Sequence, residues 1–253
     1  MMKKFLKSLI VLIAILIIWN LFCSLNIWST YVVPRPMKVW DSFVGMAESG
    51  ELFENISISL RRVLIGFCIA FFLAFFLGIL ASLIPKLTPY YNHIVEFVRN
   101  VPPMSLIPLL ILWFGIGETP KIIIIVLTSF FPIFLNTKSG ILSCDSKLLE
   151  VGDSLGFSDG QKFFKIMLPN AVPSILVGMR IGLGYSWRAI VGAEMIAAAS
   201  GLGYLILDAQ QMSRSDKVLV GIFVIGILGY FCDRLFYLII KNISYGGVGD
   251  SWS

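Results

Sequence analysis

Six long apolar runs recur along this chain of 253 residues and limit what it can fold into. About 20 apolar residues in a helix cross the hydrocarbon core of a bilayer, and a backbone in lipid must satisfy its own hydrogen bonds. We therefore predict an all-α integral membrane protein with about six transmembrane helices. The predicted spans are Phe5–Leu25, Ser59–Ile84, Ile94–Trp113, Lys121–Ile141, Ala171–Ala199 and Val218–Ile240.

The overall composition supports this class. Hydrophobic residues make up 57% of the chain, charged residues 14%, and the mean hydropathy is +0.88. A soluble domain has about 25% charged residues and could not cover this much apolar surface. The basic residues behind the net charge of +5 are scattered, so we expect no nucleic-acid partner. One histidine and four cysteines without a CxxC pattern predict neither a metal site nor a disulfide framework.

Basic residues near the chain ends predict the topology. Lys3 and Lys4 precede the first apolar run, and Arg234 and Lys241 flank the end of the last one. Positive charge favours the cytoplasmic side, so both termini are expected in the cytoplasm. We interpret 1–253 as one membrane domain, with an anchor span at 1–25, a transport core at 59–240, cytoplasmic helices at 144–169 and a loosely ordered tail at 244–253.

A polar stretch, Ser146–Pro169, separates the fourth and fifth predicted spans. Asp145 or Ser146 can cap a first helix, and Gly156 can end it in the left-handed conformation. That helix carries an apolar stripe, made by Leu148, Val151 and Leu155. Its place between spans predicts exposure at the cytoplasmic face.

A second short helix follows in the same stretch. Ser158 with Gln161 matches a capping box, and Phe163 and Phe164 contribute to an apolar face. Pro169 ends the helix or begins the next span. The pattern predicts two short helices at an angle, a knob that can fit a groove on a soluble partner.

The knob sequence resembles a known family motif. Glu150-Val-Gly-Asp-Ser-Leu-Gly156, followed by Ile166-Met-Leu-Pro169, resembles the EAA loop of ABC-importer permeases, with Val151 and Gly152 in place of the two alanines. The resemblance implies that this loop docks on an ATPase subunit. The implied coupling residues are Glu150, Gly152, Ser154, Leu155, Gly156, Phe157 and Pro169.

Further segments resemble the nitrate, sulfonate and taurine permeases within that family. They are Val33-Pro-Arg-Pro36, Ser59–Gly66, Arg99-Asn-Val-Pro-Pro103, Trp113-Phe-Gly-Ile-Gly117, Phe131-Pro-Ile with Asn136-Thr137, and Gly201–Ile206. The resemblance implies a permease in the plasma membrane of a prokaryote. Its implied partners are an ATP-binding subunit dimer, a second copy of the permease in a homodimer, and an extracytoplasmic substrate-binding protein.

The chain is expected to be a non-catalytic subunit. It has no GxxxxGK[ST] loop with which to hold a nucleotide. We therefore expect that it binds no cofactor and that ATP and Mg²⁺ belong to the partner ATPase.

Four polar or aromatic residues in the fifth span, and a proline pair in the third, are candidate pathway residues. A charge within a membrane helix is costly and normally faces a cavity or a partner. Arg188 departs from the apolar residue of the resembled pattern, and we hypothesise that it favours an anionic substrate; the alternative is an ion pair between helices or subunits. The candidates are Arg180, Trp187, Arg188, Glu194, Pro102 and Pro103.

Other charged residues suggest surface positions. Arg61 and Arg62 begin the second predicted span, where we favour snorkelling at the interface over docking of a binding protein. Glu118 and Lys121 are expected on a solvated face. The stretch Lys38–Ile56 predicts an amphipathic helix.

Several functions stay open at this point. A sulfonate, taurine or nitrate is the expected substrate, and a neutral pyrimidine vitamin precursor is the alternative. An ATPase-independent secondary transporter or channel is a different class, although it would leave the knob without a purpose. A membrane enzyme would need clustered catalytic side chains that this sequence lacks.

Overall fold

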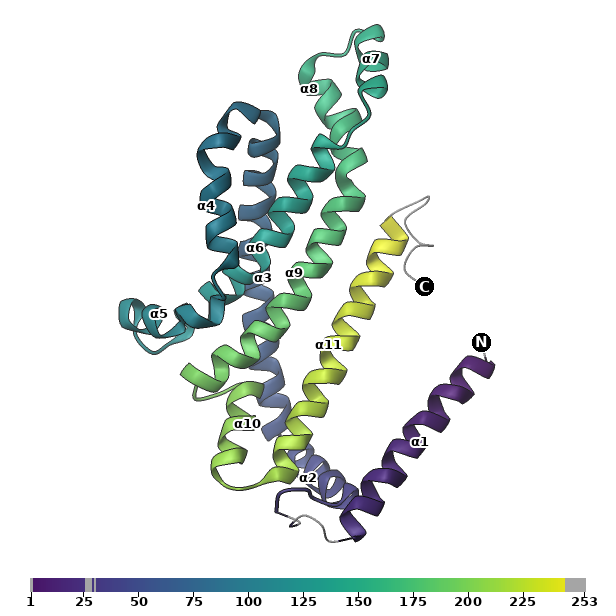
Figure 1. The fold of residues 1–253 in the computed structure, drawn as a ribbon, viewed down its shortest axis with the longest axis vertical. Coiled ribbons are helices and arrows are strands. Elements are labelled where there is room, and N and C mark those ends of the chain that lie inside the picture. The colour runs from purple at the N-terminus through teal and green to yellow at the C-terminus, as the bar shows by residue number, and fades with distance from the viewer. Residues whose placement is uncertain (1, 26–28, 30, 244–253) are drawn as a thin grey trace.

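The computed structural model describes residues 2–25, 29 and 31–243, and these residues form helices and no strand. The predicted tail, 244–253, lies outside the described residues. The chain order is shown in Figure 1. The helices are α1 (Met2–Ser24), α2 (Pro36–Glu48), α3 (Glu51–Leu83), η1 (Pro85–Leu87), α4 (Thr88–Asn100), η2 (Pro103–Leu106), α5 (Ile107–Phe114), α6 (Glu118–Leu142), α7 (Ser146–Ser154), α8 (Asp159–Lys162), η3 (Phe163–Met167), α9 (Leu168–Ala197), α10 (Leu202–Gln211) and α11 (Ser215–Ile243).

Four helices among the described residues are long and apolar enough to cross a membrane. They are Glu51–Leu83, Glu118–Leu142, Asp159–Ala197 and Ser215–Leu238. A bent pair gives a fifth if it is counted as one span, and the described apolar part of α1, Ile13–Ser24, is shorter than a span. The all-α membrane fold is confirmed, and the count of six spans stays a prediction.

The third predicted span is a broken helix. Pro85–Asn100 and Pro103–Phe114 meet at an angle of 86°. Pro102 and Pro103 stand at the junction, where proline removes two backbone donors and disfavours helical geometry in the preceding residue. The interruption that these prolines predict within Ile94–Trp113 is therefore present as a sharp break.

The centre of the bundle is a close packing of α3, α6 and α9, which lie side by side in Figure 1. Glycines permit the approach of α6 to α9. A Cβ on Gly178 would lie 2.7 Å from the Asn136 Cβ and 2.8 Å from the Pro132 carbonyl oxygen. On α3, a Cβ on Gly66 would lie 2.6 Å from the Ile125 side chain. Small residues of this kind are how membrane helices gain packing contacts.

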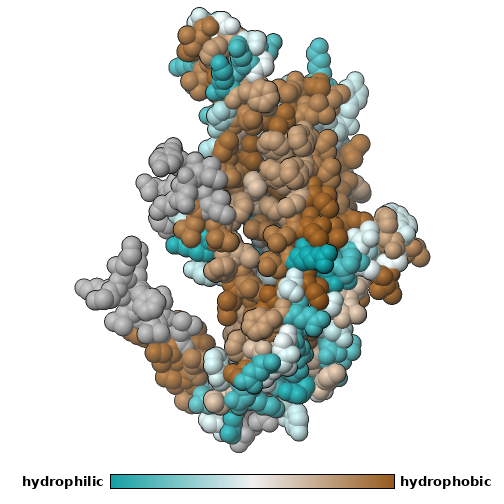
Figure 2. Space-filling view, turned by 180° about the vertical axis from the view of Figure 1, so that it is seen from behind, coloured by the Kyte–Doolittle hydropathy of each residue, from teal (hydrophilic) through white to brown (hydrophobic). Residues whose placement is uncertain are grey.

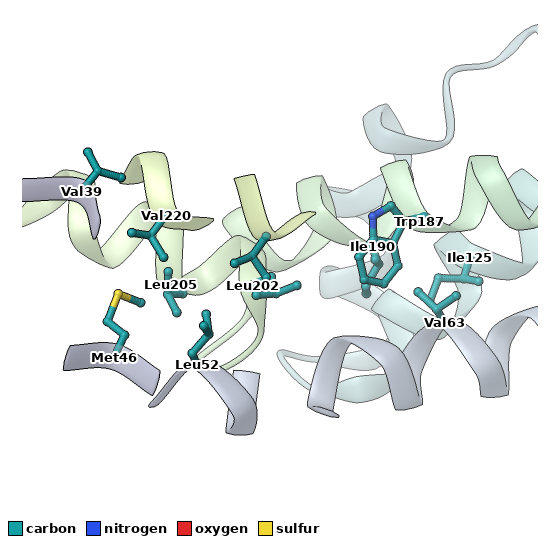
Figure 3. Packing of buried hydrophobic residues seen from close by; sticks show 11 residues of the cluster. Val39, Met46, Leu52, Val63, Ile125, Trp187, Ile190, Leu202, Leu205 and Val220 are labelled. Carbon is teal, nitrogen blue, oxygen red and sulfur yellow. The ribbon is translucent and has the colours of Figure 1, made fainter. Parts of the chain in front are cut away.

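A second packing centre lies at the end of the bundle that holds α2 and α10. Figure 3 shows Met46, Leu52, Leu202, Leu205 and Val220 converging from helices α2, α3, α10 and α11. The amphipathic helix predicted over Lys38–Ile56 is confirmed only in its first part, as α2, because α2 ends at Glu48 and α3 begins at Glu51. The inner face of α2, with Val39 and Met46 buried, packs against α11 and the start of α3.

Helix α1 stands apart from the bundle in Figure 1 and meets it near α2. The ring of Trp19 lies 6.3 Å from that of Phe223, and Cys23 is buried against the backbone at Val33 and Pro34. Most described side chains of α1 are apolar and exposed within one chain.

The surface carries an apolar belt. Figure 2 shows hydrophobic residues over much of the middle of the molecule, with hydrophilic residues gathered at the α7–α8 tip and toward the opposite end. This distribution suits a bilayer around the middle and water at both ends.

The glycines of α9 provide a matched stability test. We expect Gly178→Ala to lower the free energy of unfolding by about 1–3 kcal/mol, because the methyl group meets backbone atoms of α6. Gly184→Ala is the control, since a Cβ there has no atom within 4 Å. Thermal unfolding in detergent measures both, and equal stability of the two variants would contradict the packing described here.

Candidate functional site

The polar segment between α6 and α9 forms a knob at one end of the molecule. Figure 1 shows α7 and α8 beyond the tips of α6 and α9, at the end opposite α2 and α10. We call residues 145–167 the knob and the opposite end the far end.

The local signals in the knob act as the sequence predicts. The Asp145 side chain accepts a hydrogen bond from the Lys147 backbone N–H at 2.9 Å and caps α7. Gly156 has φ +73° after the helix, and the Phe157 N–H donates to the Gly152 carbonyl at 2.9 Å. This is the Schellman arrangement for which glycine is favoured.

The capping box that begins α8 is also confirmed. The Ser158 hydroxyl accepts from the Gln161 backbone N–H at 3.4 Å, and the Gln161 side chain accepts from the Ser158 backbone N–H at 2.9 Å. The second helix, however, is not a separate unit. It continues through the π-helical turn η3 into α9, which makes one helix of 39 residues over Asp159–Ala197. Pro169 lies in its interior, within the first turn of α9.

Gly152 lies where α7 crosses this long helix. It is buried, and a Cβ there would lie 2.9 Å from the Ile166 Cδ1 and 3.2 Å from the Lys162 Cγ. The Lys162 ammonium bridges Asp153 at 2.7 Å and Asp159 at 2.9 Å. Glycine at position 152 thus leaves room for the side chains of Ile166 and Lys162 where the two helices meet.

The outward face of the knob is apolar and uncovered within this chain. Its exposed side chains are Leu148, Val151, Leu155 and Phe164. Phe163 does not join them, because it is buried against α6 and α9 beside Ile141 and Ala171. At the base of the knob, burial and then the neighbouring Asp145 raise the pKa of the Cys144 thiol.

An ion network centred on the buried Arg62 ties four helices together at the far end. Arg62 of α3 is 4% exposed and donates to Glu194 of α9 at 2.7 Å and to Glu118 of α6 at 2.6 and 2.7 Å. Lys121 is also buried and donates to Glu118 at 2.9 Å. The Arg62 guanidinium donates further to the Ser200 carbonyl, next to α10.

This network corrects the surface positions expected for Arg62 and Lys121, which are buried, whereas the Glu118 side chain is 57% exposed, as expected. Helix α3 begins at Glu51, well before the predicted span, so Arg62 lies within the helix and faces the bundle. Its neighbour Arg61 points outward and is exposed, as interfacial snorkelling predicts.

Glu194 is fully buried and has its carboxylate fully occupied. It accepts from the Ser59 hydroxyl at 2.8 Å, from Arg62, and from the Gly203 backbone N–H at 3.0 Å. Gly201, with φ +110°, and Gly203 leave room for this seat, because a Cβ on either would collide with the Glu194 side chain or the Val191 carbonyl. The segment Gly201-Leu202-Gly203 thus leaves the space that the buried Glu194 carboxylate occupies.

The other predicted pathway residues of α9 have different environments. Arg180 forms a two-pronged ion pair with Asp233 of α11, with both N–O distances at 2.7 Å. Trp187 is buried and donates to the Ile225 carbonyl at 3.0 Å. These contacts hold α9 to α11, and the pathway role of Arg180, Trp187 and Glu194 stays a prediction.

Arg188 differs from all of these. It is exposed and has no hydrogen bond or ion pair with any described residue. It lies on the same face of α9 as Ile181 and Tyr185, which are also exposed. Next to this face, Pro103 lines a cavity of about 520 Å³, whereas Pro102 is exposed at the break.

The sequence comparisons decide the family. The profile described as "Binding-protein-dependent transport system inner membrane component" matches residues 66–245, most of the bundle. The chain belongs to this permease family. It is 37% identical over 237 residues to the putative aliphatic sulfonates transport permease protein SsuC of Bacillus subtilis, covering 94% of this chain and 86% of the relative.

Two more similarities agree with this assignment. The permease is 34% identical over 227 residues to the taurine transport system permease protein TauC of Escherichia coli, covering 88% of this chain and 82% of the relative. Its fold matches a chain of the MetNI methionine ABC transporter in inward-facing conformations, with a TM-score of 0.68, 17% identity and coverage of 76% of this chain and 95% of that one. The permease is therefore a multi-pass membrane component of the importer class.

Two features of the permease escaped sequence reasoning. Arg62 carried a signal in retrospect, since an arginine and a glutamate in separate apolar spans each need a partner. The cavity beside Pro103 carried none, because it exists only where the broken helix meets α6 and α9.

The buried pair allows a stability prediction. Arg62→Gln is expected to lower the free energy of unfolding by about 3–5 kcal/mol, because it leaves the buried Glu194 without its cation. Arg61→Gln is the control, and as an exposed position it should change stability by less than about 0.5 kcal/mol. Thermal unfolding in detergent measures both variants. Equal melting temperatures of the two variants would contradict the prediction.

Proposed function

We propose that the permease moves a small organic or inorganic anion, such as a sulfonate, taurine or nitrate, across the plasma membrane toward the cytoplasm. An extracytoplasmic binding protein delivers the substrate, and a separate dimeric ATPase supplies the energy. Two copies of the permease form the translocation unit. This chain binds no nucleotide, and ATP with Mg²⁺ is held by the ATPase.

The uncovered apolar face of the knob is the observation that carries the proposal. Leu148 and Val151 on α7, and Leu155 at its C-terminal cap, are exposed beyond the apolar belt that Figure 2 shows. Apolar side chains clustered in this way at an aqueous face mark a protein contact. The partner of this face is a groove on an ATPase subunit. Glu150, Ser154 and Phe157 of the knob lie at the rim of the contact.

The continuity of the knob with α9 supplies the mechanical link. Movement of the docked knob is carried along the single helix Asp159–Ala197 to the face that bears Arg188. A rocking motion of the bundles then exchanges access between the two sides, as alternating access requires. With the knob in the cytoplasm, both chain termini lie on the cytoplasmic side as well.

The substrate class draws on the relatives and on Arg188. SsuC and TauC are named for aliphatic sulfonates and taurine. An exposed guanidinium without an internal partner suits a sulfonate or nitrate, whose oxygens accept two parallel N–H bonds. The alternative for Arg188, an ion pair across the dimer, leads to a different outcome in the test below.

The function is tested by ATP hydrolysis of the purified complex in lipid with its ATPase and loaded binding protein. Taurine, alkanesulfonates, nitrate and a pyrimidine precursor form the panel. Stimulation by an anion is expected. Stimulation by the neutral compound alone would overturn the substrate class, and failure of any ATPase to copurify would overturn the importer function.

The knob can be tested by a matched pair of substitutions. Leu155→Asp places a charge in the apolar contact and is expected to weaken ATPase binding about thirtyfold or more, the size of a lost interface hot spot. Met212→Asp at the far end is the control, because the two side chains are 65% and 66% exposed. Copurified ATPase is measured, and an equal yield for both variants would exclude the knob as the docking surface.

Arg188 is tested by uptake into proteoliposomes. Arg188→Ala is expected to lower uptake of the stimulating anion about tenfold or more, through loss of a charged hydrogen-bond donor, while permease dimers remain intact. Arg188→Lys should retain part of the activity because the charge stays. Unchanged uptake with weakened dimers would instead assign Arg188 to an ion pair between subunits.

A further inference from the structure

A cavity of about 520 Å³ lies at the α4–α5 break, between the end of α4 and the sides of α6 and α9. This volume is within the range of sites that hold small molecules. We infer that the cavity is an anion-binding site within the permease, that Arg99 is its charged ligand, and that it takes a small, singly charged oxyanion of the sulfonate type. The inference rests on the proposed function for its biological role.

The charge of the lining decides the sign of the ligand. Arg99 is the one charged side chain among the described residues that line the cavity, and no carboxylate faces it. The guanidinium makes no hydrogen bond or ion pair with a described residue. The nearest acid along α4, Glu96, accepts instead from Asn92 at 2.9 Å and lies 4.0 Å from His93.

Arg99 lies at a height in the bundle where a charge without a partner is energetically costly. In Figure 1 the α4–α5 break lies between the knob and the far end, well inside the length of α3 and α9. A charge at such a depth costs about 2.5–3.5 kcal/mol on insertion scales and normally faces water, a ligand or a partner. The adjacent cavity gives Arg99 that environment.

Neutral polar groups complete the site. Asn100, Asn136 and Tyr185 line the same cavity, together with Thr128, whose hydroxyl donates to backbone carbonyls of α6, and the remaining lining is largely apolar. The Tyr185 hydroxyl makes no hydrogen bond with a described residue, so it is available as a donor. Each asparagine amide gives one N–H to a backbone carbonyl, Glu96 or Pro132, and keeps a second N–H. Donors around one fixed cation are the chemistry that a sulfonate recognises.

The cavity also adjoins the pathway residue proposed above. Ile181 and Tyr185 line it, and Arg188 follows on the same helical face, about one turn nearer the far end. The Arg99 guanidinium of α4 therefore lines the cavity on which α9 borders, and the Arg188 guanidinium of α9 lies beyond it on the same helical face. Arg188 meets an anion arriving from the far end, and Arg99 holds it at the broken helix.

The experiment measures binding directly, without the binding protein. Methanesulfonate is titrated into the purified permease–ATPase complex by calorimetry, with dimethyl sulfone as an uncharged compound of similar shape. We expect saturable binding of methanesulfonate and none of dimethyl sulfone. Arg99→Gln should weaken binding at least about tenfold, as loss of a charged donor does. Arg61→Gln, which removes an exposed arginine outside the cavity, should leave binding unchanged.

A second variant separates loss of the site from loss of folding. Ile181→Trp fills the cavity without removing a charge, and it should abolish binding while ATPase copurification and the melting temperature remain those of the wild type. Wild-type binding by Arg99→Gln, equal binding of dimethyl sulfone, or no saturable methanesulfonate binding to the wild type would each overturn the site. Because ATPase stimulation is measured separately, failure of the importer function is distinguishable from failure of the anion site.

Discussion

The buried pair of Arg62 and Glu194 is the interaction on which the far end of the bundle depends. Arg62 comes from α3, Glu194 from α9, and their further partners come from α6 and the segment that begins α10. Buried charges are tolerated only when every donor and acceptor is used, and here both groups are fully bonded. The pair therefore demands one relative position of four helices. The glycines at 201 and 203 belong to the same constraint, since side chains there would displace the carboxylate.

Helix α9 connects the features that matter for transport. It begins as the second helix of the knob, passes the cavity at Tyr185 and the exposed Arg188, and reaches the buried Glu194 near its end. One helix, with a π-helical turn at Phe163–Met167 and with Pro169 and Pro173 inside it, joins a surface suited to an ATPase with a surface suited to an anion. The tight packing of α9 against α6, through Gly178 and Gly182, makes the pair move together rather than bend independently.

Local chemistry explains why much of the knob could be predicted. The cap at Asp145, the left-handed Gly156 and the capping box at Ser158 depend on residues a few positions apart, so their pattern is visible in the chain itself. The continuity of α8 with α9 was missed because Pro169, a usual helix boundary, lies in a first turn that another helix precedes. Arg62 was misplaced because the start of α3 depends on packing against α2 and α10 rather than on hydropathy.

The sequence by itself determined the membrane class, the helical content and the knob, because the bilayer allows few backbone solutions and capping acts over short range. The family followed from motifs spread along the chain, and the comparisons confirm it. Only the tertiary structure decided which charges are buried in pairs and which remain free. Arg62, Arg99 and Arg188 look alike in the sequence. The register of α3 against α9 buries Arg62 in the bundle, whereas the angle at Pro102–Pro103 and the packing of α9 leave Arg99 and Arg188 facing open space.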